Sequence, residues 1–190
     1  MRRSRTLFLV GLLLAASASA EPLVLELDPN QTRVEFGFGA TLHSVSGSLR
    51  LEHGRLEIDP VTGAASGEIV LDAKSAKTGV ARRDEKMHQE ILESATFPKV
   101  TYTLERIDGA VHRTGRSEIQ LHGTLELHGV RLPAAIVAVA TVDGDKVTAT
   151  GTFTVPYREW GMKDPSVFVL RVEKEVHIQI KAVGVLKPAG

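Results

Sequence analysis

Hydrophobic and polar residues alternate along most of the chain beyond residue 23. In the clearest early stretch, Val34, Phe36 and Phe38 alternate with Glu35 and Gly37. A period of two places successive side chains on opposite faces of a strand, so this pattern predicts antiparallel strands with one apolar face and one solvated face. The same alternation recurs over residues 100–105, 119–127, 147–155 and 176–181.

Turn-forming residues separate these stretches. They occur at Asp28-Pro29-Asn30, His53-Gly54, Asp59-Pro60, Asp108-Gly109 and Asp143-Gly144-Asp145. We expect eight strands, centred near residues 25, 36, 48, 69, 102, 122, 137 and 150, and a ninth near 178. The stretch 134–140 is apolar on both faces, which predicts either a strand covered on its outside or one whose small alanines pack against a neighbour.

One segment lacks the alternation. Met87 and Ile91 have helical spacing within Ala81–Leu92, which follows Thr78-Gly79. We therefore expect one short helix there. Many antiparallel strands with one helix favour a closed barrel, because closure removes exposed strand edges; a two-layer sandwich is the alternative. The predicted fold class is all-β, an eight-stranded antiparallel barrel with one short helix.

The first 20 residues have the pattern of a secretory signal peptide. Basic residues open the chain, residues 7–16 form an apolar run, and Ala18-Ser19-Ala20 is a small-residue cleavage site. The apolar run is shorter than the roughly 20 residues that cross a bilayer, which disfavours a membrane anchor. Cleavage at about Ala20 leaves a single domain over residues 21–190, which we expect in the periplasm or outside the cell.

Charge and composition narrow the function classes. The chain has 23 basic and 23 acidic residues, and removal of a leader with three arginines leaves 20 basic against 23 acidic residues, a net charge of −3. Nucleic-acid binding needs a basic patch, so we expect no nucleic-acid partner. The chain has no Cys, which excludes disulfides and a thiol nucleophile. No segment after the leader predicts stable membrane insertion.

Candidate catalytic groups are few. The sequence has no Gly-x-Ser-x-Gly motif, no Gly-rich phosphate loop and no His-Glu-x-x-His motif. His43 and Ser44 are neighbours, but adjacent side chains of a strand point to opposite faces. His122, Glu126 and His128 share one face of a predicted strand and could hold a metal ion, although a solvated outer face explains the same pattern. We predict no catalytic residue, no metal and no cofactor.

Arg82, Arg83 and Asp84 form a charged group at the start of the predicted helix. Arginines are unfavourable near the positive end of the helix dipole, which favours the presence of an anionic partner such as a lipid head group or a carboxylate. An ordinary surface ion pair with Asp84 or Glu85 also explains them.

Several phrases follow one another in a recognisable order between residues 24 and 184. They are TRVEF (32–36), VSGSL (45–49), GRLEIDP (54–60), KTG (77–79), RRD (82–84), ESATFPKVTY (93–102) and LHGTLELHGV (121–130). Together they resemble the YceI-like family of exported, lipocalin-like proteins. The resemblance implies an antiparallel eight-stranded barrel, a long apolar channel, no catalytic residues, and binding of a polyisoprenoid or a similar amphiphile such as an isoprenoid quinone. KMHQEIL (86–92) and the segment 155–166 depart from the family pattern, which leaves the identity of the ligand open.

An apolar channel would suit such a ligand, because each CH₂ removed from water contributes about 0.8 kcal/mol. We expect nine side chains to line or pack this lumen: Phe36, Phe38, Leu71, Tyr102, Leu104, Leu121, Leu125, Phe153 and Ile178. Arg82, Arg83 and Asp84 are expected at its mouth, near a polar head group. Trp160 and Phe168 are expected to form either a rim or lid, or a hydrophobic plug.

Two other functions remain open from the sequence. One is a protein-interaction or stress-response module with a filled core. The other is a hydrolase or isomerase that uses His43 or the residues His122–His128. A dimer is compatible with all three interpretations.

Overall fold

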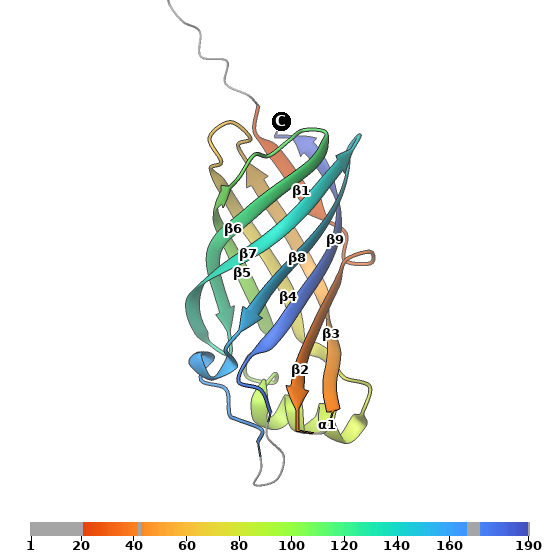
Figure 1. Cartoon of the computed structure of the whole chain (residues 1–190), viewed down its shortest axis with the longest axis vertical. Coiled ribbons are helices and arrows are strands. Elements are labelled where there is room, and N and C mark those ends of the chain that lie inside the picture. The colour runs from red at the N-terminus through yellow and green to blue at the C-terminus, as the bar shows by residue number, and fades with distance from the viewer. Residues whose placement is uncertain (1–20, 42, 167–171, 190) are drawn as a thin grey trace, which may run out of the picture.

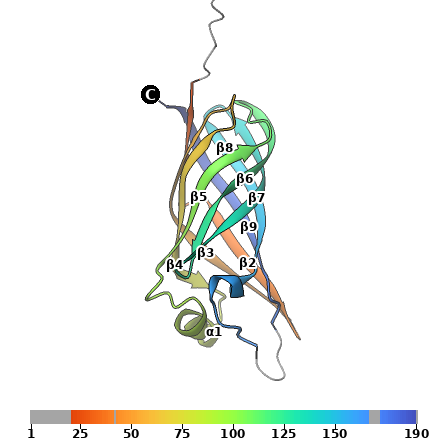
Figure 2. The same cartoon turned by 90° about the vertical axis from the view of Figure 1, so that its left-hand side faces the viewer.

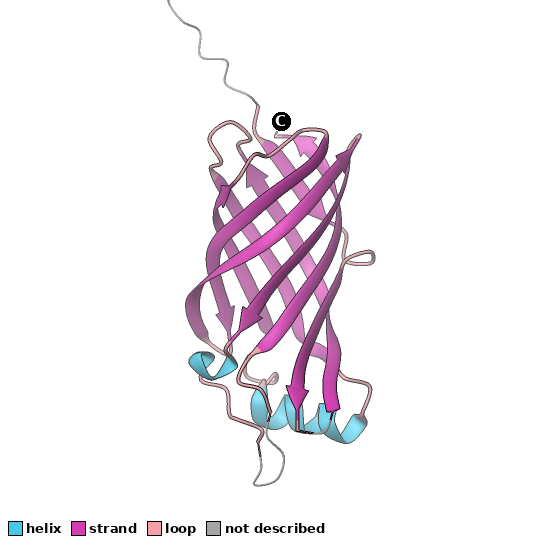
Figure 3. Cartoon of the chain, viewed as in Figure 1, coloured by secondary structure: helices cyan, strands magenta, loops and turns pink. Residues whose placement is uncertain are grey.

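The computed structural model describes residues 21–41, 43–166 and 172–189. The predicted signal peptide and Phe168 lie outside these residues. Nine antiparallel strands form one sheet that closes on itself (Figure 1 and Figure 3). They are β1 Leu23–Leu27, β2 Arg33–Ala40, β3 His43–Ile58, β4 Ala65–Lys77, β5 Lys99–Asp108, β6 Gly115–Leu127, β7 Val130–Asp143, β8 Lys146–Val155 and β9 Val176–Pro188.

Strands β1 and β2 occupy one position in the barrel wall, end to end. Both pair with β3 on one side and with β9 on the other. Nine strands therefore fill eight positions, and β3 closes the barrel by pairing with β4. This confirms the predicted eight-stranded antiparallel barrel and excludes the two-layer sandwich.

A short turn between β1 and β2 interrupts the wall at Asp28–Thr32. The Val183 N–H of β9 donates a hydrogen bond to Thr32 Oγ1 at 3.2 Å, and the same hydroxyl donates to the Val183 carbonyl at 3.3 Å. The Asp28 N–H also donates to the Val183 carbonyl, at 2.8 Å. A side chain thus replaces backbone partners that the interrupted strand does not supply, and the ladder stays satisfied.

Strand β3 passes without a break through His53 and Gly54, where the sequence predicted a turn. That prediction is wrong. A Cβ atom at position 54 would lie 2.7 Å from Leu27 Cδ1, so glycine here lets the Leu27 side chain of β1 pack directly against the backbone of β3. The pairing of β3 with β4 shifts register nearby, between Leu51 and His53.

The predicted helix is confirmed as α1 Ala81–Lys86, which continues directly into the π-helical turn η1 Met87–Ile91. Because it connects the end of β4 to the start of β5, it lies at one end of the barrel, here called the helix end. Figure 2 shows α1 there together with the short 3-10 helix η2 Tyr157–Trp160. The loop 109–114 joins β5 to β6 at the opposite end, here called the far end.

Strand β7 contains the doubly apolar stretch 134–140. Its Ile136 and Ala138 side chains are buried toward the barrel interior, whereas Val137 points outward and is 60% exposed. No other described part of the chain covers this outer face. Ala138 and Ala140 therefore belong to the inner wall, whereas Ala135 is exposed on the outer face. No helix among the described residues is long and apolar enough to span a membrane.

Candidate ligand site in the barrel lumen

A continuous apolar cavity occupies the barrel interior and has a volume of about 530 Å³. Its wall includes Val142 and Val147 toward the far end and Met87 and Leu92 at the helix end. This volume falls within the range of about 300–1,000 Å³ that is typical of small-molecule sites. We refer to this cavity as the lumen.

Most of the predicted lumen residues border this cavity. The eight that do so are Phe36, Phe38, Leu71, Tyr102, Leu121, Leu125, Phe153 and Ile178. Leu104 does not border it. Its side chain is 2% exposed and belongs to the surrounding hydrophobic core, next to the register shift of β5 between Leu104 and Arg106.

The aromatic ring of Tyr102 lies against Gly123 of the neighbouring strand β6. A Cβ atom at position 123 would lie 2.1 Å from the Thr103 carbonyl oxygen and 3.0 Å from Tyr102 Cζ, so glycine permits the close approach of the β5 backbone and leaves space for the ring. The Tyr102 hydroxyl donates a hydrogen bond to the Ala134 carbonyl at 3.3 Å. Burial raises the pKa of Tyr102 to about 12, and the negative charge of Glu105 contributes. The phenol is therefore neutral at physiological pH and adds no charge to the lumen.

Arg83 and Lys86 bring positive charge to the helix end of the lumen, where both border the cavity. Arg83 Nε donates a hydrogen bond to Thr78 Oγ1 at 2.7 Å, and Arg83 Nη2 donates to the Thr78 carbonyl at 3.3 Å. These bonds orient the guanidinium but leave it without a carboxylate partner within 4.0 Å among the described residues. Lys86 has a long contact, 3.9 Å, with Glu90.

Asp84 is fixed by Thr78 and does not border the cavity. The Thr78 hydroxyl and the Thr78 N–H both donate to Asp84 Oδ1, the latter at 2.8 Å. The hydroxyl bond is the main reason why the pKa of Asp84 lies below its usual range, although desolvation opposes the shift. Arg82 is exposed and also lies outside the cavity wall. Of the three predicted mouth residues, the structure places Arg83 alone on the lumen.

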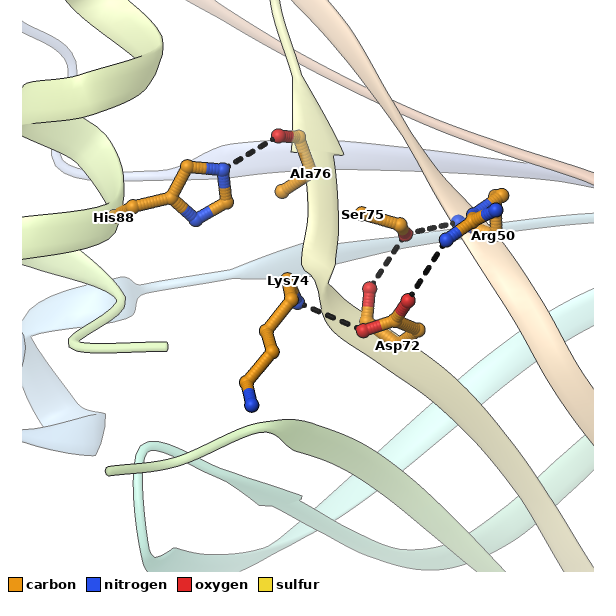
Figure 4. Close-up of polar contacts among 6 residues, drawn as sticks. All are labelled: Arg50, Asp72, Lys74, Ser75, Ala76 and His88. Carbon is orange, nitrogen blue, oxygen red and sulfur yellow. Dashed lines mark hydrogen bonds and ion pairs between the residues drawn. The ribbon is translucent and has the colours of Figure 1, made fainter. Parts of the chain in front are cut away.

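His88 ties the helix to the end of β4 (Figure 4). Its Nε2 atom is 2.9 Å from the Ala76 carbonyl, and its Nδ1 atom is 2.9 Å from Ser94 Oγ. The carbonyl can only accept, so Nε2 carries a proton. No residue of α1 or η1 is buried, but Ile91 packs against the hydrophobic core, so apolar packing and these polar contacts together position the helix over the lumen.

The end of β4 bends toward the helix through an irregular stretch at residues 73–76. Opposite it, the Arg50 N–H of β3 donates to Ser75 Oγ at 2.8 Å, and Ser75 Oγ donates to the Asp72 carbonyl at 2.5 Å (Figure 4). Arg50 Nη2 also lies 3.1 Å from Asp72 Oδ2. The serine hydroxyl thus replaces a backbone acceptor that the regular pairing of β3 with β4 would supply. The bulge also brings the Ala76 carbonyl within hydrogen-bonding distance of His88.

Trp160 is buried and does not form a rim. Its side chain is 4% exposed, belongs to the core, and donates a hydrogen bond from Nε1 to the Leu125 carbonyl at 3.3 Å. Tyr157 and Met162, on either side of it, border the lumen instead. This placement is that of the hydrophobic plug, the alternative left open by the sequence. Phe168, the other predicted rim residue, is not among the described residues.

The polar stripe His122, Glu126 and His128 does not converge. His122 Nε2 lies 2.9 Å from Asp108, and Glu126 pairs with Arg131 at 3.5 Å. Strand β6 ends at Leu127, and His128 has a φ of +52°, so its ring leaves the face of the strand. The described residues contain no group of three or more potential metal ligands.

The family model for the YceI-like domain matches residues 25–184. The chain belongs to the YceI-like family. Curated relatives from Pseudomonas savastanoi pv. phaseolicola and Pseudomonas syringae pv. tomato, both named UPF0312 protein, are 27% identical over 165 residues. These alignments cover 82% of this chain and 83% of each relative.

Solved structures share this YceI-like fold. BcnA from Burkholderia cenocepacia superimposes with a TM-score of 0.71 at 18% identity, covering 83% of this chain and 98% of that protein. A domain from Saccharophagus degradans, described as polyisoprenoid-binding and implicated in plant cell wall breakdown, gives 0.67 at 16% identity, covering 86% and 98%. At these identities the similarity establishes the fold.

Sequence reasoning did not identify five polar residues that border the lumen of this YceI-like barrel, namely Thr32, Thr78, Lys86, His112 and Ser117. Ser117 was detectable, because it continues the inward row Ile119 and Leu121 at the same spacing of two. His112 lies in a loop, where no periodicity indicates the direction of a side chain.

Proposed function

We propose that this chain is an exported carrier protein that holds a polyisoprenoid or a similar long-chain amphiphile in the barrel lumen. The observation that carries the proposal is the cavity itself, whose wall consists almost entirely of aliphatic and aromatic side chains. Such a wall removes a long hydrocarbon chain from water, which is the main free-energy gain available to this kind of ligand. The polyisoprenoid-binding description of the Saccharophagus degradans domain supports the same ligand class.

The lumen residues that border the cavity are proposed to contact the hydrocarbon chain. Arg83, together with Lys86, is proposed to attract a polar or anionic head group at the helix end, because both are cationic and both reach the wall. Phe168 remains a predicted rim residue, and a dimer remains a prediction. An isoprenoid quinone is one member of the proposed ligand class.

Export is part of the proposal and rests on the signal-peptide pattern of residues 1–20. The proposed carrier holds its ligand without chemistry, in keeping with a wall that is almost entirely apolar. The proposed place of action is the periplasm or the outside of the cell.

The proposal is tested by native mass spectrometry of the protein purified from its own host, followed by organic extraction. A co-purifying long-chain lipid of defined mass is the expected result. Mass-spectrometric sequencing of the mature N-terminus should show that the chain starts at about Glu21. A protein without bound mass that also fails to take up added polyprenols would contradict the carrier function.

A further inference from the structure

The polar groups around the lumen differ in whether they already have partners. Thr32 exchanges hydrogen bonds with Val183, and the Tyr102 hydroxyl donates to the Ala134 carbonyl. The Tyr157 hydroxyl reaches Asp164 at 3.4 Å. These groups are engaged by the barrel itself and are poorly available to a ligand.

Ser117 and His112 are different. The Ser117 side chain is 4% exposed and borders the lumen. Its Oγ atom accepts a hydrogen bond from the His112 N–H at 2.9 Å, which leaves the hydroxyl proton to point elsewhere. Among the described residues no acceptor receives that proton. The His112 imidazole also borders the lumen, but His112 is exposed to solvent, so water reaches its ring.

Both residues lie at the far end of the barrel. Ser117 is near the start of β6, where it pairs with Ala140, and His112 is in the loop 109–114, which runs across this end in Figure 1. The charged side chains that border the lumen, Arg83 and Lys86, lie at the helix end instead. The two ends therefore offer different chemistry: cations at the helix end, and at the far end a buried hydroxyl beside an imidazole.

We propose that Ser117 and His112 form a second polar subsite, which binds an uncharged oxygen group, a hydroxyl or a carbonyl, on a long-chain ligand. This inference rests on the proposed lipid-binding function and adds a recognition element to it. A buried hydroxyl with an unused proton gains most from an acceptor that arrives with the ligand, because water is excluded by the apolar wall around it. A hydrocarbon chain without such a group leaves the hydroxyl unpaired.

The test compares hexadecanol with hexadecane, which have chains of equal length but differ by one hydroxyl group. Affinities are measured by displacement of the neutral fluorescent dye phenylnaphthylamine from the full mature protein. Wild type should bind hexadecanol about three- to tenfold more tightly than hexadecane, as expected for one or two net hydrogen bonds. Ser117→Ala should abolish this preference, and Ser117→Thr, which keeps the hydroxyl, should retain it.

Three further variants test whether the preference for hexadecanol arises at Ser117 and His112 or elsewhere in the protein. His112→Leu should reduce the preference while keeping the bond between its N–H and Ser117. Ser46→Ala, on the exposed outer face of β3, is the matched control and should behave as wild type. Arg83→Met should weaken binding of hexadecanoate without altering the ratio of hexadecanol to hexadecane.

The outcomes distinguish the two proposals. A ratio unchanged by Ser117→Ala but lost in Arg83→Met would place the oxygen group at the helix end and overturn the far-end subsite, while leaving the carrier function intact. Failure of both hexadecane and hexadecanol to displace the dye would overturn lipid binding in the lumen, and the subsite with it.

Discussion

The imidazole of His128 and the carboxylate of Glu93 lie 2.9 Å apart and connect three segments at the helix end of the barrel. Glu93 follows the helix, and His128 occupies the turn between β6 and β7. The other ring nitrogen, Nδ1, is 3.2 Å from the Trp160 carbonyl in η2. Both partners, a carbonyl and a carboxylate, are hydrogen-bond acceptors. The ring of His128 also lies 4.4 Å from that of Phe97, measured between centroids.

Replacing His128 with Asn should therefore destabilise the protein by about 1–3 kcal/mol, because a hydrogen bond to a charged group and a second bond are both lost. Asn tolerates the positive φ of this position, so the backbone itself is not the cause. Chemical denaturation gives the free energy of unfolding. His122→Asn is the comparison variant, since its Nε2 atom lies at the same 2.9 Å from a carboxylate, that of Asp108, which is 54% exposed. An equal loss in both variants would contradict a linking role for His128.

Replacing Leu121 with Trp should block the lumen. Leu121 borders the cavity from the inner face of β6, and a Trp side chain would fill space that the ligand needs. We expect at least a tenfold loss of affinity for a polyprenol, with a stability change of about 1–3 kcal/mol from overpacking. Val137→Trp introduces the same side chain on the outer face of β7 and should bind normally. Equal binding by both variants would show that the ligand does not enter the barrel.

The alternation of Val34, Phe36 and Phe38 was enough to predict which side chains face the interior, because the period of a strand fixes the face. It could not reveal that Leu104 is enclosed by the core, since a local register shift decides its neighbours. The turn predicted at Gly54 failed for a related reason. Glycine permits both a turn and a close approach of another strand, and only the position of Leu27 distinguishes them.

The mouth shows a second limit of sequence reasoning. The charged group at residues 82–84 correctly marked the helix end of the barrel, but the helix turns its neighbouring side chains in different directions. Arg83 reaches the lumen, while Arg82 faces solvent. His128 was assigned to a solvated strand face because the sequence does not show where β6 ends or that the next residue has a positive φ.

Replacing Leu104 or Leu71 with Ala should distinguish a core residue, which mainly affects stability, from a lumen residue, which mainly affects ligand binding. Leu104→Ala removes a side chain that is 2% exposed and enclosed by core neighbours, so it should cost about 2–5 kcal/mol and leave ligand affinity nearly unchanged. Leu71 already borders open space, so Leu71→Ala should cost less, below about 2 kcal/mol, and should weaken lipid binding. Thermal unfolding and dye displacement on the same two proteins give both quantities. The reverse order of stabilities would show that the lumen at Leu71 is packed.

Asp84 should contribute to stability only above acidic pH. Its pKa is lowered in the folded protein, chiefly by the Thr78 hydroxyl, from an ordinary value of 3.8. The folded state therefore holds the proton less tightly than the unfolded state, so the contribution is fully present above that ordinary value and disappears as pH falls through the folded pKa. Asp84→Asn should cost about 1 kcal/mol at neutral pH and progressively less toward acid, as measured by denaturation at a series of pH values. Thr78→Val should produce the same trend by removing the donor, whereas Glu85→Gln, at an exposed neighbouring carboxylate, should not. A penalty for Asp84→Asn that grows as the pH falls would have the wrong sign and would show that Thr78 does not stabilise the charged form.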